Sequence, residues 1–370
     1  MTRPLAELTT LKVGGPAREL LEPSTVDELV EAARTAWAEA DDPDDVVVLG
    51  GGSNVVAPDE GFDGTVILTG DVRGIEVVAA DDGRVHLRAA AGEPWDEVVS
   101  FAVANGFAGI TSLSGIPGTS GAAPVQNIGA YGRELADTLV AVELLDLVSG
   151  AIARVPAAEL GLAYRTSILK HGRRAVVLSV DIALVRDRRA PVGYAQLASS
   201  LGIPLGAHVP LDDLRAGVLA LRGQKGMLLG PGLPDSAGSF FTNPIVDENW
   251  ARRLPADAPR WPVAADAPDL VAPLDEGPRP AASPDRREVK LSAAWLIEQS
   301  GIPRGYRLPG SNAAISSLHT LSIVNAGGAT AREIVQLAEF VQARVSADFG
   351  VNLQPEPVIL RGDPVPDEVE

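Results

Sequence analysis

Residues 115–132 read GIPGTSGAAPVQNIGAYG, with glycine at five of these positions and proline at two. This composition is not typical of a helix interior or of an ordinary strand, because glycine weakens both and proline lacks an N–H group. Backbone N–H groups between such small residues can bind phosphate without any basic side chain. One amide hydrogen bond to a charged oxygen contributes about 1.5–3 kcal/mol. The stretch therefore predicts a pyrophosphate-binding cradle, although a structural loop explains the glycines equally well.

A second glycine-rich turn precedes this stretch. Val46–Leu49 is a short apolar run that predicts a buried strand. It continues directly into Gly50-Gly51-Gly52-Ser53-Asn54, where a serine and an asparagine follow the glycines. Such a turn at a strand end is a candidate contact for phosphate or ribose, and a plain turn accounts for it as well.

The hydrophobic pattern around the two turns predicts an α+β protein. Helices are expected after the Thr25/Glu28 capping box until Asp41, from Pro94 to Asn105, over residues 209–222 up to Gly223, over residues 290–299, and from the Thr330/Glu333 capping box to Gly350. Strands are expected within residues 65–90 around the turn Asp82-Gly83, in a hairpin of residues 139–147 and 151–155, and at residues 175–185, 321–325 and 358–360.

The composition excludes several classes of function. The chain has 370 residues and a net charge of −18, which suggests two or three domains and argues against nucleic-acid binding. It has no cysteine, and its four histidines lack ligand spacing, so we expect no metal. Neither a signal peptide nor a membrane-spanning run is found, and we expect a cytoplasmic protein without membrane contact. Residues 254–285 are rich in proline, alanine and acidic residues, and we interpret them as an exposed insertion without a core.

Three polar residues stand out as candidates for chemistry. Arg165, in the segment YRTS, could hold a carboxylate through its planar guanidinium, although most arginines are solvated surface residues. Ser239 lies beside two phenylalanines in GSFFTNP, so its hydroxyl is a candidate proton donor or a satisfied turn residue. Glu356 lies between Pro355 and Pro357, which fix an extended backbone and could position an acid.

Taken together, these motifs resemble the UDP-N-acetylenolpyruvoylglucosamine reductase family over almost the whole chain. The resemblance rests on LKVGG, LGGGSN, the stretch at residues 115–132, YRTS, GSFFTNP, KLSAAWLIEQ and QPEP, in this order. It implies a vanillyl-alcohol-oxidase-type (PCMH-type) FAD-binding fold followed by a C-terminal α+β substrate-binding domain. FAD would then be held by glycine loops, since the chain has no GxGxxG motif after a strand.

The resemblance also implies domain boundaries. Residues 1–70 would form one FAD-binding subdomain, joined by a C-terminal strand at about 357–362, and residues 71–205 a second. Residues 206–356 would form the substrate-binding domain with the insertion at 254–285, and residues 363–370 an acidic tail.

The resemblance assigns roles to individual residues. Arg165, Ser239 and Glu356 match the catalytic residues: arginine and glutamate stabilise negative charge, and serine protonates C2 of the substrate. The FAD contacts would be Gly51, Gly52, Ser53, Asn54, Gly115, Ile116, Pro117, Gly118, Thr119, Gly121, Ala122, Gln126, Asn127, Gly129, Ala130, Tyr131 and Gly132. The substrate contacts would be Tyr164, Tyr194, Lys225, Asn243 and Gln299, with Tyr194 on the mobile loop of the family's type I branch.

The implied reaction uses NADPH to reduce bound FAD, which then reduces the enolpyruvyl ether of UDP-N-acetylglucosamine enolpyruvate to UDP-N-acetylmuramate. Negative charge develops on the substrate carboxylate, so positive charge and hydrogen bonds must be aimed at it in advance. The expected protein is a monomer. Two alternatives remain: a flavin oxidase of the same fold that uses O2, and a non-catalytic binder of flavin or nucleotide. The catalytic trio disfavours both.

Overall fold

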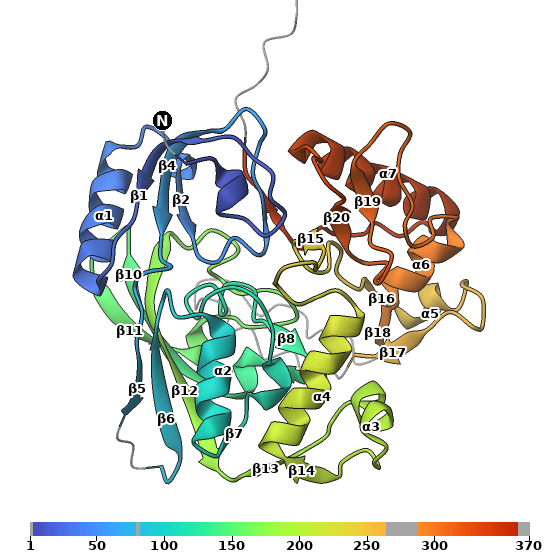
Figure 1. Ribbon diagram of the computed structural model, residues 1–370, viewed down its shortest axis with the longest axis horizontal. Coiled ribbons are helices and arrows are strands. Elements are labelled where there is room, and N and C mark those ends of the chain that lie inside the picture. Colours follow the sequence, from blue (N-terminus) through green and yellow to red (C-terminus); the bar gives the residue numbers. More distant parts are fainter. Residues whose placement is uncertain (1–2, 79–81, 264–286, 362–370) are drawn as a thin grey trace, which may run out of the picture.

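The computed structural model describes residues 3–78, 82–263 and 287–361, which form a larger and a smaller lobe (Figure 1). The larger lobe contains the N-terminal elements and the glycine-rich loop, and the smaller lobe contains the C-terminal helices. Within the described residues, no helix is long and apolar enough to cross a membrane. The fold is the predicted α+β type, with separate sheets and helices in each lobe.

A three-stranded parallel sheet of order β1-β4-β2 begins the larger lobe. Its strands are β1 (Ala17–Leu21), β4 (Phe62–Leu68) and β2 (Val46–Leu49), and α1 (Val26–Glu39) follows β1. Thr25 caps α1, as predicted, because its Oγ1 accepts the N–H of Glu28. The apolar side of α1 shares a core with Ile67 of β4 and Leu178 of the next sheet. The end of β2, and with it the turn at residues 50–54, is thereby fixed.

An antiparallel sheet of order β11-β10-β12-β6-β5 forms the centre of the larger lobe. Both predicted hairpins are present, since Val77 pairs with Leu87 and Val142 with Val155. The helix α2 (Trp95–Ala104) buries its apolar stripe in the same core. The strands are β5 (Ile75–Val78), β6 (Val85–Ala90), β10 (Leu139–Asp146), β11 (Ile152–Pro156) and β12 (Ala175–Arg186), with the short β7 (Phe107–Ala108) paired to the end of β12.

The helix α4 (Leu211–Gln224) belongs to the larger lobe by its packing. Its Leu214, Val218 and Leu221 are buried in the core that contains α2, although the helix was expected in the substrate-binding domain. The boundary expected at residue 206 therefore moves beyond this helix, which also continues through Gly223 instead of ending there. Before α4 lie β13 (Arg189–Pro191), α3 (Ala195–Leu201) and β14 (His208–Pro210).

The smaller lobe contains two short antiparallel sheets, of which the one with β19 (Ala313–Ile315) and β20 (Ile323–Asn325) packs against α7 (Ala331–Phe349). The capping box and the terminal Gly350 of α7 are as predicted. The predicted helix at 290–299 begins later, because Lys290 and Leu291 belong to a strand and Ser292 caps α6 (Ala293–Gln299). The remaining elements are β15 (Asp235–Ser236), β16 (Ile245–Asp247), α5 (Glu248–Ala251), β17 (Arg260–Pro262) and β18 (Glu288–Leu291).

The start of the expected insertion is part of the folded core. Leu254 and Ala258 are buried in the core of the smaller lobe, and β17 pairs with β18. The expectation that residues 254–285 have no core is therefore wrong for residues 254–262, whose proline and alanine content concealed two buried apolar positions. Residues 264–286 and the acidic tail from residue 362 lie outside the described residues.

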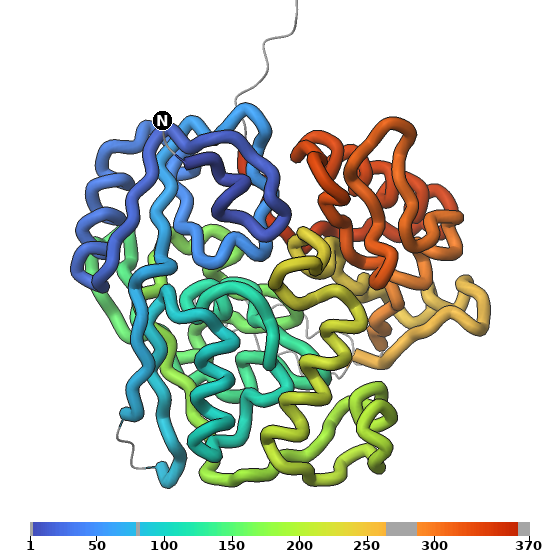
Figure 2. Tube along the Cα trace, in the orientation of Figure 1, coloured from blue at the N-terminus to red at the C-terminus, as the bar shows by residue number. Residues whose placement is uncertain are grey.

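The chain returns to the larger lobe at its C-terminal end, where β21 (Val358–Ile359) pairs in parallel with β3 (Val55–Val56). Figure 2 shows this red segment beside the blue N-terminal trace. The pairing brings Glu356 close to the turn at residues 50–54, because β3 follows that turn directly. A ribbon of β8 (Gly129–Ala130) and β9 (Arg133–Glu134) ends the glycine-rich stretch. Short 3-10 helices lie at Leu5–Glu7, Pro43–Asp45, Thr111–Leu113, Leu135–Asp137 and Ala157–Glu159.

Candidate active site

A cavity of about 160 Å³ lies between the two glycine-rich turns. One wall is the turn after β2, and the opposite wall is formed by residues between Pro117 and Ile128 of the glycine-rich stretch. Of the predicted FAD contacts, the cavity is lined by Gly51, Gly52, Ser53, Asn54, Pro117, Gly118, Thr119, Ala122 and Gln126. A second cavity of about 110 Å³ adjoins it through shared lining residues and includes Gly121.

The close approach of the two turns explains the glycines. A Cβ atom on Gly51 would lie 2.9 Å from the Cα atom of Gly118, which is closer than real Cβ atoms come. Gly52 and Gly118 have φ angles of +57° and +107°, which favour glycine. At these glycines the backbone itself therefore forms the wall of the cavity.

The residues present fit a dinucleotide such as FAD. The hydroxyl of Thr119 is buried in the wall between the two turns and has no hydrogen-bond partner within the described residues. A buried hydroxyl without a partner is costly, so a ligand oxygen would satisfy it. The backbone N–H groups of the glycine turns and the Thr119 hydroxyl can donate hydrogen bonds to a diphosphate, so an acidic protein can bind one without a basic surface. Within the described residues, no cluster of histidine, aspartate and glutamate could hold a metal ion.

We expect Gly51→Ala to weaken FAD binding at least tenfold, because its Cβ would push the two turns apart. The measurement is the flavin content of the purified protein and a titration of the apoprotein with FAD. Gly70→Ala is the matched control, since a Cβ at Gly70 meets nothing within 4 Å. Unchanged FAD affinity in Gly51→Ala would contradict the assignment of the cavity.

Asn127 and residues 129–132 of the glycine-rich stretch do not line this cavity, although Gln126 and Ile128 do. Asn127 is fully buried with a left-handed backbone, and its side chain bonds within the protein, to Glu134, Ala163 and Ala136. The side-chain amide of Asn127 is therefore engaged within the loop, and a contact of this residue with FAD stays a prediction. Gly115 likewise lies outside both cavities and is held by Asp96 and Arg222.

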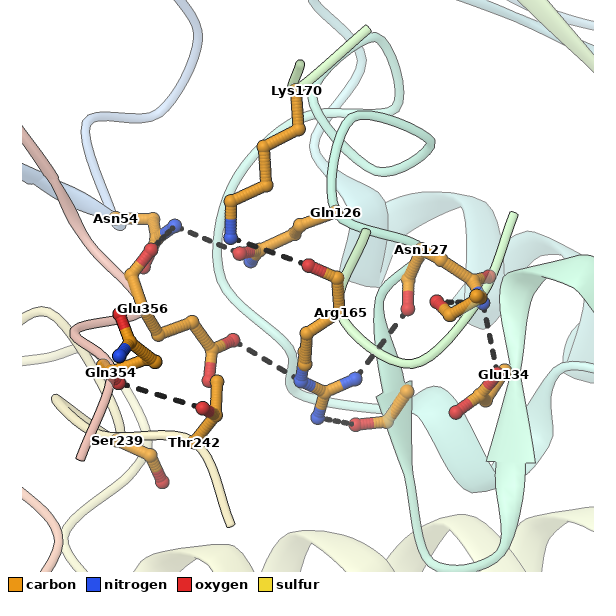
Figure 3. Close-up of polar contacts among 12 residues, drawn as sticks. Asn54, Gln126, Asn127, Glu134, Arg165, Lys170, Ser239, Thr242, Gln354 and Glu356 are labelled. Atoms are coloured by element: carbon orange, nitrogen blue, oxygen red, sulfur yellow. Dashed lines mark hydrogen bonds and ion pairs between the residues drawn. The ribbon is translucent and has the colours of Figure 1, made fainter. Parts of the chain in front are cut away.

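The ribbon of β8 and β9 holds the candidate catalytic arginine. The guanidinium of Arg165 donates to the carbonyl oxygens of Gly129 at 2.6 Å and Asn127 at 3.4 Å. Its Nε lies 3.2 Å from the Glu356 carboxylate, so the guanidinium bridges the loop and the C-terminal segment (Figure 3). Since a guanidinium has five N–H groups and these contacts use three, the other two remain for a ligand within the described surroundings.

Glu356 is placed by backbone pairing. Its N–H donates to the carbonyl of Phe240 at 2.9 Å, and its carbonyl accepts the side-chain amide of Asn54. Asn54 also donates to Gln126, so the acid is tied to the wall of the FAD cavity. Burial raises the pKa of the Glu356 carboxyl, while Arg165 and then Lys170 oppose this shift.

Ser239 reaches the same region through the segment that pairs with QPEP. Phe240 and Thr242 bond to Glu356 and Gln354 respectively, which sets Ser239 beside the Glu356 segment (Figure 3). The flanking Phe240 and Phe241 are both buried and hold the segment in the core of the smaller lobe. The structure therefore brings Arg165 and Glu356 into contact and places Ser239 on the segment that pairs with Glu356.

His319 is a site residue that the sequence did not reveal. Its Nε2 lies 3.3 Å from the Oγ of Ser239, a hydrogen-bonding distance. Burial lowers the pKa of His319 to about 4, with further lowering by Lys225, Arg222 and Arg304. The imidazole is therefore neutral at pH 7. Nothing in the local sequence SSLHTL distinguishes this histidine, because only the packing of a distant loop brings it to Ser239.

A second group of side chains gathers near the end of α4. The rings of Tyr131 and Tyr194 are 5.6 Å apart, and the Lys225 ammonium lies 5.9 Å from the Tyr131 ring centre. Lys225 also donates to Gln196 at 3.0 Å. Burial lowers the pKa of Lys225, with a smaller contribution from Arg222. Tyr131, expected to contact FAD, thus lies with the predicted substrate residues.

The other predicted substrate residues are divided. Burial raises the pKa of Tyr164, and Asn243 hydrogen-bonds to it, so these two lie together. The ammonium of Lys290 lies 3.8 Å from the Tyr164 ring centre. Gln299 is exposed at the end of α6, and no contact places it with the others.

Two further cations near the site were missed. Lys170 lines the FAD cavity and donates to the carbonyl of Arg165 at 3.3 Å. Arg222 is buried and donates to the carbonyls of Gly115 and Met227, both at 3.0 Å. The scarcity of lysine in the chain was a usable signal for Lys170, whereas Arg222 resembles any helical arginine in the sequence.

Comparisons with known proteins agree with this geometry. Residues 17–155 match the FAD binding domain model, and residues 231–360 match the model for UDP-N-acetylenolpyruvoylglucosamine reductase, C-terminal domain. The chain is 54% identical over 380 residues to the UDP-N-acetylenolpyruvoylglucosamine reductase of Leifsonia xyli subsp. xyli, covering 97% of this chain and 99% of the relative. It is 47% identical over 360 residues to the enzyme of that name from Saccharopolyspora erythraea, covering 96% of this chain and 94% of the relative.

A solved structure is also similar. The crystal structure of UDP-N-acetylenolpyruvylglucosamine reductase from Thermus caldophilus aligns with a TM-score of 0.62 at 27% identity. The alignment covers 97% of this chain and 98% of that one. The FAD-binding domain, the C-terminal domain and the overall fold thus all match proteins of the same family.

Proposed function

The chain belongs to the UDP-N-acetylenolpyruvoylglucosamine reductase family, and on that premise we propose how its residues carry out the reaction. It is an FAD-binding oxidoreductase that uses NADPH and acts in peptidoglycan precursor synthesis. The proposal rests mainly on the contact of Arg165 with Glu356 beside the proposed FAD cavity. Ser239 lies on the segment that pairs with Glu356. Bound FAD supplies the chemistry of taking a hydride from NADPH and passing it to C3 of the enolpyruvyl group.

Arg165 binds the substrate carboxylate and stabilises the negative charge that develops on it. Its two remaining N–H groups suit a carboxylate, and its position is fixed by Glu356 and by two loop carbonyls. Arg165 has a left-handed backbone with a φ of +57°, a conformation that costs a non-glycine residue about 1–3 kcal/mol. A strained backbone at a residue whose side chain is fixed by an ion pair and two hydrogen bonds supports a functional role for Arg165.

Ser239 donates its hydroxyl proton to C2 after the hydride has reached C3. The Oγ–H bond breaks, the C2–H bond forms, and the negative charge passes to Oγ, which water then protonates again. Tyr194 and Lys225, which lie beside Tyr131, hold the diphosphate of the substrate, with Tyr194 covering it from its loop. Tyr164 and Asn243 orient the part of the substrate nearer Arg165.

The test of the reaction is NADPH oxidation by the purified FAD-loaded protein, measured with and without UDP-N-acetylglucosamine enolpyruvate. We expect the absorbance at the NADPH band to fall only when the enolpyruvyl substrate is present, with UDP-N-acetylmuramate as the product. NADPH oxidation at the same rate with and without the enolpyruvyl substrate, and no UDP-N-acetylmuramate formed, would contradict the proposed reaction.

We further propose that the protein acts as a monomer in the cytoplasm. Arg165 and Glu356 form an ion pair and Ser239 lies on the segment paired to Glu356, so one chain assembles these residues itself. The absence of cysteine and the use of NADPH are compatible with a reducing compartment. Sedimentation of the active protein at working concentrations tests the monomer.

A further inference from the structure

A serine is a weak acid, so a proposal that Ser239 gives up a proton needs a group that stabilises the resulting alkoxide. Arg165 is committed to Glu356, the loop carbonyls and the substrate carboxylate. The one described side chain within hydrogen-bonding distance of the Ser239 hydroxyl is His319, at 3.3 Å from Nε2 to Oγ. The role of this contact rests on the proposed function of Ser239.

The loop that carries His319 is rigidly held. It joins β19 to β20, and the N–H of Ser316 donates to Ser322 across its base. Thr320 donates to Glu298 of α6, and the Leu321 carbonyl accepts the N–H of Phe240. This last bond joins the loop to the residue that follows Ser239. The positions of His319 and Ser239 are therefore fixed relative to each other before any substrate binds.

Burial keeps the imidazole of His319 neutral, and the positive charges around it add to this effect and favour an anion at Ser239. Lys225, Arg222 and Arg304 are the charged groups that act on the imidazole, and all are positive. The turn after α4 reaches the same loop, since a Cβ on Gly226 would lie 2.9 Å from the Leu318 side chain. A neutral imidazole in this positive surrounding has one N–H to donate, and a negative oxygen is its favoured acceptor.

We propose that His319 is a positioning residue for Ser239, whose neutral Nε2–H donates to Oγ and stabilises the alkoxide formed when the Ser239 proton moves to substrate C2. The Nε2–H bond stays intact throughout the step. Only the Oγ–H bond breaks, and water restores that proton after the product carbon is saturated.

The test compares His319→Leu with His319→Gln in the FAD-loaded protein by stopped-flow spectroscopy. The leucine has no donor, and the glutamine amide can place one near the position of Nε2. We expect His319→Leu to slow flavin reoxidation by the enolpyruvyl substrate about 10–100-fold, the effect expected for one hydrogen bond to a charged oxygen. His319→Gln should stay within about fivefold of the wild type, and flavin reduction by NADPH should be unchanged in both.

Two readouts separate this role from a merely structural one. Adding His319→Leu to Ser239→Ala should slow reoxidation by less than about twofold, because the donor then has no alkoxide to stabilise. The loss caused by His319→Leu should be equal at pH 6 and pH 8, since His319 is neutral above a pKa of about 4. A loss that grows toward low pH would identify an imidazolium proton donor and overturn the proposal.

Controls keep the outcomes distinct. His208→Leu removes an exposed histidine of β14 and should leave both half-reactions unchanged. If His319→Leu loses FAD, His319→Asn replaces it, because that amide is polar but too short to reach Oγ. Equal reoxidation rates in His319→Leu and wild type, with a slow Ser239→Ala, would overturn the role of His319 alone. If the enolpyruvyl substrate does not reoxidise the reduced flavin of the wild type, the proposed function itself is overturned.

Discussion

Ser239→Ala is expected to slow reoxidation of the flavin by the enolpyruvyl substrate about 10²–10⁴-fold, the usual contribution of a positioned proton donor. Reduction of the flavin by NADPH should stay within about twofold, because it requires no proton at substrate C2. Stopped-flow traces of the two half-reactions measure both rates. The fold should survive, since the segment is held by the backbone bonds of Phe240 and Thr242 and not by the serine hydroxyl.

Ser317→Ala is the matched control for this variant. Ser317 is exposed on the loop of His319, so its loss removes a nearby hydroxyl without touching the Oγ–Nε2 contact. It should retain wild-type rates in both half-reactions. An unchanged reoxidation rate in Ser239→Ala would eliminate the serine as the proton donor and would also remove the basis for the role of His319.

Arg165→Lys is expected to lower turnover about 10²–10³-fold while FAD affinity falls less than tenfold. Lysine keeps the charge but has no planar fork, so it cannot contact Glu356, the two loop carbonyls and a substrate carboxylate together. The Glu356 carboxylate and the carbonyls of Asn127 and Gly129 would then lose hydrogen bonds that the Arg165 guanidinium now donates. Steady-state kinetics and a flavin titration measure the two effects.

Arg154→Lys is the matched control for the arginine. Arg154 also contacts a buried carboxylate, Asp181, but on the central sheet among residues that do not line the FAD cavity. It should change stability slightly and turnover by less than about twofold. Parallel loss of FAD and turnover in Arg165→Lys would show instead that Arg165 acts through the loop that Asn127 and Gly129 form.

The local sequence determined the turns, caps and most elements. Thr25 and Thr330 cap the predicted helices because their hydroxyls reach N–H groups three residues away. The glycines of residues 50–54 and 115–121 belong to turns whose backbones nearly touch. These features are decided within a few residues, and the family motifs predicted the FAD-binding fold and the enzyme class without coordinates.

Only the tertiary structure decided which side chains meet. Glu356 and Ser239 lie together because the Phe240 carbonyl accepts the N–H of Glu356, and backbone hydrogen bonds of this kind leave no pattern in the side chains. The same reason hid His319, which appears ordinary until the β19–β20 loop packs on the Ser239 segment. Packing also corrected two sequence interpretations, since apolar contacts assign α4 to the larger lobe and residues 254–262 to a core. Local composition determined how each segment bends, and burial of apolar surface between distant segments determined the site.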